Sequence, residues 1–155
     1  MRIKQNDVRC YPVIQKVGCF VRSCGAVAEN IVGKELTAQQ INDLWDWSKQ
    51  SGHINLKDEV KHSAPIITHA IELLGGTGKV YEIGTFNKGK LGYYKSVSEA
   101  IRKKPKHYIQ KIETVNKNTH FRVVAYDGKV IFDPYDPQPK ATKIIYSLIY
   151  AYCEE

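Results

Sequence analysis

The chain has 155 residues, of which 43% are hydrophobic and 25% charged, as is typical of a single globular domain with one core. Its 23 basic residues outnumber the 16 acidic ones and give a net charge of +7, which suits an acidic or nucleic-acid partner. No apolar run is long enough to span a membrane and no secretory signal opens the sequence, so we expect one domain over residues 1–155 that acts in the cytoplasm.

The first predicted helix lies in the segment GCFVRSCGAVAENIVGK at residues 18–34. Apolar side chains recur there at helical spacing, at Phe20, Cys24, Val27 and Ile31. Because glycine is a typical helix stop, the pattern predicts a helix that begins at Cys19 and ends before Gly33.

The helical phase separates the two cysteines of this segment. Cys19 lies at the helix N-terminus, where free backbone N–H groups and the helix dipole favour a thiolate. Cys24 lies mid-helix on the apolar stripe, where a thiol acts as a small hydrophobic side chain. Cys19 is therefore the better candidate for a nucleophile, and Cys24 is the alternative. The four cysteines fit no metal-binding pattern, so we expect them to be reduced and expect neither a metal nor another cofactor.

The rest of the chain divides into a helical part and a strand-rich part. A capping box at Thr37 and Gln40 predicts a second helix that ends at Gly52, and Ser63 with Pro65 in its first turn begins a third. β-Branched and aromatic residues then predict five strands, over residues 79–86, 107–115, 119–126, 129–133 and 143–152. A short helix is expected between the first two strands, at 96–104. This order indicates the α+β class, with N-terminal helices packed on a C-terminal antiparallel β-sheet.

A basic segment from Lys88 to Lys111 contains eight Lys or Arg residues against one acidic residue, and three tyrosines lie among them. Such a segment can bind nucleic acid, because the positive charge releases counterions and the rings stack on bases. A solvated lysine face would have the same composition. The densest part of this possible basic surface consists of Arg102, Lys103, Lys104 and Lys106.

His120 differs from the other four histidines because a predicted hairpin follows it. Asp127–Gly128 separates two β runs and predicts a two-residue type I′ turn, which would place Arg122 opposite Asp133. His120 and Asp133 would then be diagonal neighbours at roughly 7–8 Å on one face. Asp133 could hold the His120 imidazole in one tautomer and stabilise its charged form. Alternatively, Asp133 forms a structural ion pair with Arg122.

The order of these features resembles the papain-like cysteine peptidase superfamily. Within it, the chain is most similar to small bacterial and phage proteins related to double-glycine-type bacteriocin-leader peptidases. The resemblance rests on Gly18–Cys19 before the helix and Gly33–Lys34 after it, on LTAQQIN at 36–42, and on HFRVVAYDGKVIFDP at 120–134. It implies a papain-like fold and a thiol protease that cleaves a peptide or related amide bond.

The resemblance assigns Cys19 as the nucleophile, His120 as the general base and acid, and Asp133 as the residue that orients His120. The family adds a glutamine about six residues before the cysteine as an oxyanion donor. Position 13 is Val here, so either Gln15 reaches the site through an altered loop or the oxyanion hole lacks this donor. The substrate would be a peptide or protein. The alternative is a catalytically inactive papain-like protein that binds nucleic acid or an acidic protein through its basic segment.

Overall fold

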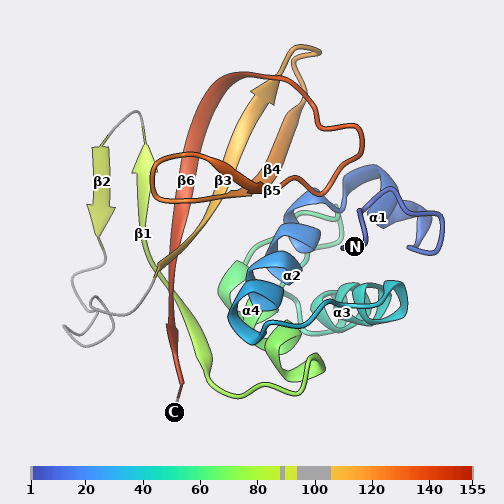
Figure 1. The fold of residues 1–155 in the computed structure, drawn as a ribbon. Coiled ribbons are helices and arrows are strands. Elements are labelled where there is room, and N and C mark those ends of the chain that lie inside the picture. The colour runs from blue at the N-terminus through green and yellow to red at the C-terminus, as the bar shows by residue number, and fades with distance from the viewer. Residues whose placement is uncertain (1, 88–89, 94–105, 155) are drawn as a thin grey trace.

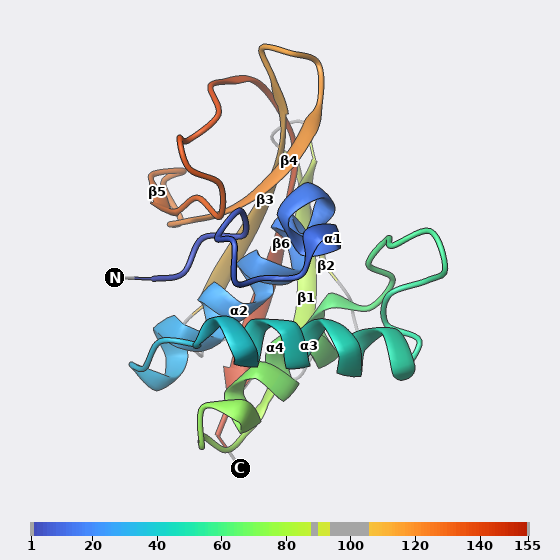
Figure 2. The ribbon, with the colours of Figure 1, turned by 90° about the vertical axis from the view of Figure 1, so that its right-hand side faces the viewer.

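The helices lie on one face of an antiparallel sheet in this computed structural model, which describes residues 2–87, 90–93 and 106–154. They stand beside the sheet in Figure 1 and in front of it in Figure 2. The helices of the described residues are α1 Pro12–Val17, α2 Cys19–Val32, α3 Ala38–Gln50 and α4 Ser63–Leu73. None of them is long and apolar enough to cross a membrane.

The sequence signals for the three longer helices are confirmed. Helix α2 begins at Cys19 and ends at Val32, before Gly33, whose φ of 80° is the left-handed conformation that a glycine adopts without strain. Helix α3 has the predicted capping box, with the Thr37 hydroxyl accepting from the Gln40 backbone N–H. The short helix α1 was not predicted.

Six described strands form one sheet in the order β2-β1-β6-β3-β4-β5, so the last strand of the chain lies between β1 and β3. Strand β2 was not predicted. The strands are β1 Lys79–Asn87, β2 Lys90–Tyr93, β3 Lys106–Thr114, β4 Thr119–Val124, β5 Val130–Phe132 and β6 Ala141–Cys153. The α+β class with an antiparallel sheet is therefore confirmed.

Helix α2 is the central element of the core, because its residues 21–29 are all buried between α4 and the sheet. An ion pair inside this core fixes the helix. The Arg22 guanidinium donates to Glu29 Oε1 at 2.9 Å and to the Ile3 carbonyl at 2.6 Å, while Glu29 Oε2 accepts from the Leu36 N–H at 2.7 Å. These bonds tie α2 to the N-terminal segment and to the loop before α3.

The predicted hairpin exists, but its turn is different. The N–H of Ala125 donates to the Lys129 carbonyl and that of Gly128 to the Ala125 carbonyl, which closes a three-residue turn over 126–128. A type I′ turn requires positive φ at both central residues, whereas here only Gly128 has it, at 87°. The Asp127 carboxylate instead accepts from the Lys129 N–H. The prediction of a two-residue turn is therefore wrong.

Beyond the turn, β4 and β5 return to the predicted register. Val124 pairs with Val130, but a bulge follows, and Val123 pairs with Phe132. This second pair has the register that was predicted for the strand ends, so Asp133 comes to lie where the sequence placed it. The helix expected at 96–104 and three residues of the possible basic surface, Arg102 to Lys104, lie outside the described residues.

Candidate active site

Cys19 is half-buried at the start of α2, directly after α1. Gly18 allows this tight junction, because a Cβ at that position would lie 2.5 Å from the Ile14 carbonyl oxygen. The first N–H groups of a helix have no acceptor within the helix, and the dipole there favours negative charge. The junction therefore presents the Cys19 sulfur at a position that supports a thiolate.

His120 comes from β4 and is oriented by the residue that follows β5. Its Nε2 lies 2.7 Å from Asp133 Oδ1, and both side chains are buried. Asp133 Oδ1 also accepts from the Tyr135 N–H at 2.9 Å, which fixes the carboxylate. Because Asp133 occupies Nε2, the other ring nitrogen of His120 remains available for Cys19.

The electrostatics of this group favour a charged imidazole. Burial alone would lower the pKa of His120, but hydrogen bonds and negative charge from Asp133 and Cys19 outweigh burial and raise the pKa from 6.5 to about 9. At neutral pH His120 is then protonated. An imidazolium beside a cysteine is the arrangement that activates a cysteine as a nucleophile.

Arg122 does not compete with His120 for the Asp133 carboxylate. Its Nε donates to Gln110 Oε1 at 3.0 Å. Among the described residues, the ion-pair partner of Asp133 is His120. Of the two interpretations of the hairpin, the structure has the pair between His120 and Asp133.

Two other predicted site residues lie elsewhere. Cys24 is fully buried in the core, with its sulfur 3.9 Å from the Ser63 carbonyl, and burial raises the pKa of its thiol far above the ordinary range. The Gln15 amide donates to the Cys10 carbonyl at 2.8 Å, and Gln15 lines neither of the two pockets that open beside Cys19.

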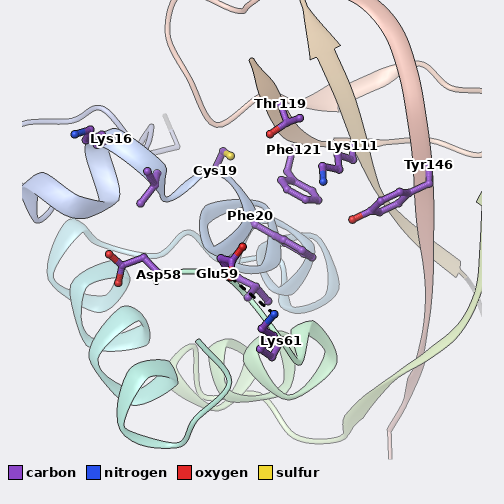
Figure 3. Close-up of a pocket in the computed structure, with 12 residues that line it drawn as sticks. Lys16, Cys19, Phe20, Asp58, Glu59, Lys61, Lys111, Thr119, Phe121 and Tyr146 are labelled. Carbon is purple, nitrogen blue, oxygen red and sulfur yellow. Dashed lines mark ion pairs between the residues drawn. The ribbon is translucent and has the colours of Figure 1, made fainter. Parts of the chain in front are cut away.

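The first of these pockets, here called the Gln5 pocket, has a volume of about 320 Å³ and contains both Cys19 and His120 in its wall. The second, the Lys111 pocket, has a volume of about 380 Å³ and is drawn in Figure 3 with Cys19 among its lining residues. Cys19 therefore stands between two cavities, each within the usual size range of a small ligand site.

Gln5 is a candidate that the sequence did not reveal. It is 2% exposed, its Oε1 is buried without a hydrogen-bond partner, and its Nε2 makes only long contacts of 3.3 and 3.4 Å to the carbonyls of Ile14 and Gln15. It lies 14 residues before Cys19, far from the spacing of about six that the papain-like resemblance implies, so no local signal could have identified it. Only the path of the folded N-terminal segment brings it to the pocket.

Hydrogen bonds hold the N-terminal segment against the residues that follow β5. Lys4 Nζ donates to the Asp133 carbonyl at 2.5 Å, the Gln5 N–H to the Pro134 carbonyl at 2.7 Å, and Asn6 Nδ2 to the Asp136 carbonyl at 2.6 Å. The same segment thus supports Asp133 and positions Gln5.

Within the described part of the chain, no group of three or more His, Cys, Asp or Glu side chains is arranged to hold a metal ion. No family model, curated protein or solved structure matches this chain.

Proposed function

We propose that this protein is a papain-like cysteine hydrolase that cleaves a peptide or related amide bond. The observation that carries the proposal is the convergence of Cys19 at the start of α2, His120 on β4 and Asp133 just after β5, with His120 Nε2 2.7 Å from Asp133 Oδ1. Burying an ion pair costs desolvation free energy, so a buried pair calls for a functional or structural explanation. Activation of a thiolate at the mouth of two pockets provides one.

The proposed reaction has two steps. The Cys19 thiolate attacks the carbonyl carbon, and the tetrahedral intermediate collapses to a thioester when His120 gives its proton to the leaving amine. Water then attacks the thioester while His120 takes one of its protons. Cys19 leaves as the thiolate, the acid product departs and His120 is again protonated. Asp133 keeps the imidazole in the orientation that both transfers require.

Gln5 takes the role of the oxyanion donor in this proposal. The backbone N–H of Cys19, at the first turn of α2, would be the other donor. The long contacts of Gln5 Nε2 leave it free to turn to a stronger acceptor, and the developing oxyanion is one. Loss of a single donor of this kind typically lowers kcat by about 10²–10³-fold.

The helices before the sheet and the Cys, His, Asp order along the chain are those expected of the papain-like fold, which we propose as the ancestry of this domain.

A mixture of unstructured peptides of diverse sequence, analysed by mass spectrometry for new termini, tests the activity without a known substrate. We expect cleavage by the parent and by Cys24→Ala, and none by Cys19→Ala or His120→Ala. Cleavage that persists in Cys19→Ala would overturn the proposal.

A further inference from the structure

The Lys111 pocket has an aromatic wall with a cation fixed at its edge. The rings of Phe20 and Phe121 stack with their centroids 4.0 Å apart. Lys111 Nζ lies 5.5 Å from the centroids of both the Phe121 and the Tyr146 rings, and Figure 3 shows it between them. The ammonium group is therefore positioned by two rings rather than free in solvent.

The positive charge of Lys111 is not neutralised by its neighbours. Asp58 and Glu59, the two carboxylates that line the pocket, already pair with Lys49 at 2.7 Å and Lys61 at 3.9 Å. Among the described residues, Lys111 has no carboxylate partner. Lys16 also lines the pocket, but in Figure 3 it points away.

Tyr146 adds a hydrogen-bond donor next to this cation. Its hydroxyl points toward the pocket in Figure 3 and has no hydrogen-bond partner in the described part of the chain. Burial, with a smaller contribution from Glu82, raises the pKa of Tyr146, so the hydroxyl stays protonated. Lys111 and Tyr146 together offer two donors to an anion above an apolar wall.

The position of His120 indicates which part of the substrate occupies each pocket. His120 lines the Gln5 pocket and not the Lys111 pocket. Because His120 must protonate the leaving amine, the leaving part of the substrate belongs in the Gln5 pocket. The acyl part, which stays on Cys19, then extends into the Lys111 pocket.

We infer that the Lys111 pocket binds an acidic side chain on the acyl side of the scissile bond. The carboxylate would accept from Lys111 Nζ and the Tyr146 hydroxyl, and its methylene groups would lie against Phe20 and Phe121. The substrates are thus acidic peptides rather than peptides cleaved without regard to charge. This inference rests on the proposed function, since it assigns the specificity of the same nucleophile.

A matched pair of covalent probes tests it: acetyl-Glu-Glu and acetyl-Gln-Gln acyloxymethyl ketones. In each, the Cys19 sulfur displaces the acyloxy group as a carboxylate and forms a thioether. The two probes have the same shape and differ in charge. We expect labelling of Cys19 to be roughly tenfold faster with the Glu probe, the size of effect that one hydrogen bond between charged groups gives.

Variants then locate the effect. Lys111→Gln should bring the ratio of the two rates close to one, and Tyr146→Phe should lower the ratio in part. Lys106→Gln is the matched control, because it removes one charge from the same strand outside the pocket and should keep the ratio.

The outcomes separate this inference from the proposed function. Equal rates with the two parent probes, or a ratio that survives Lys111→Gln, would overturn the acidic specificity and leave the hydrolase intact. Labelling of Cys19 by either probe at a rate that His120→Ala does not change would overturn the proposed function and, with it, this inference.

Discussion

Replacing Asp133 by Asn tests the coupling between the hairpin and Cys19. The amide keeps the size of the side chain but removes the charge that faces His120 Nε2 at 2.7 Å. Because Asp133 is only 3% exposed, water does not replace the lost charge. A hydrogen bond to a charged group contributes about 1.5–3 kcal/mol. At about 1.4 kcal/mol for each tenfold change, Cys19 alkylation at pH 7 should slow by about tenfold or more.

The assay is the rate of Cys19 modification by iodoacetamide between pH 6 and pH 10, quantified by peptide mass spectrometry. Cys153, which is also half-buried, serves as the internal standard in each sample. Because the pKa of His120 is about 9, the imidazolium is present at pH 6–8 and the parent should react faster there than His120→Ala. Arg122→Gln should leave the curve of the parent unchanged. Identical curves for the parent, Asp133→Asn and His120→Ala would refute the reasoning and favour the inactive binding protein.

Four further changes have defined expected outcomes. Because the pKa of His120 is raised from 6.5 to about 9, its interaction with Asp133 stabilises the folded state fully below about pH 6.5, and this stabilisation is lost as the pH rises through 9. Asp133→Asn should therefore lower the Tm more at pH 6 than at pH 10. Gln5→Ala should lower kcat/KM for a cleaved peptide by about 10²–10³-fold, whereas the same change at Gln15 should have little effect, as measured by initial rates. Glu29→Gln leaves a buried guanidinium without its charge partner and should cost about 3–5 kcal/mol of unfolding free energy in a urea titration. If the possible basic surface binds nucleic acid, a quadruple variant should bind it more weakly and with a flatter salt dependence, as measured by fluorescence anisotropy. The four changes to Gln are at Arg102, Lys103, Lys104 and Lys106.

Local periodicity was sufficient to place Cys19 at the start of α2 and Cys24 in the core. The apolar stripe of α2 and its stop at Gly33 fix the helix phase, and the phase alone separates Cys19 at the N-terminus from Cys24 in the core. The placement of His120 and Asp133 on one face could also be predicted, because alternation along two short strands is a local property, but the sequence left open whether His120 or Arg122 pairs with Asp133.

Features that depend on long-range packing could not be predicted. Gln5 reaches the pocket because its segment hydrogen-bonds to residues near Pro134, a long-range contact that no sequence spacing encodes. The predicted turn type was wrong because the Asp127 carboxylate accepts from the Lys129 N–H and so stabilises a three-residue turn instead of a two-residue turn. The Lys111 pocket likewise combines residues from α2, β3, β4 and β6.

The most direct test of the account is the titration of His120 by NMR, followed through its imidazole resonances in the parent and in Cys19→Ala. The account predicts a pKa of about 9 in the parent, because the Cys19 sulfur and Asp133 both stabilise the imidazolium. The pKa should fall in Cys19→Ala, where one of the two anionic partners is gone, and fall further when Asp133→Asn is added. A His120 that titrates at or below 6.5 in the parent, with the same value in Cys19→Ala, would contradict the thiolate–imidazolium pair on which the proposed chemistry depends.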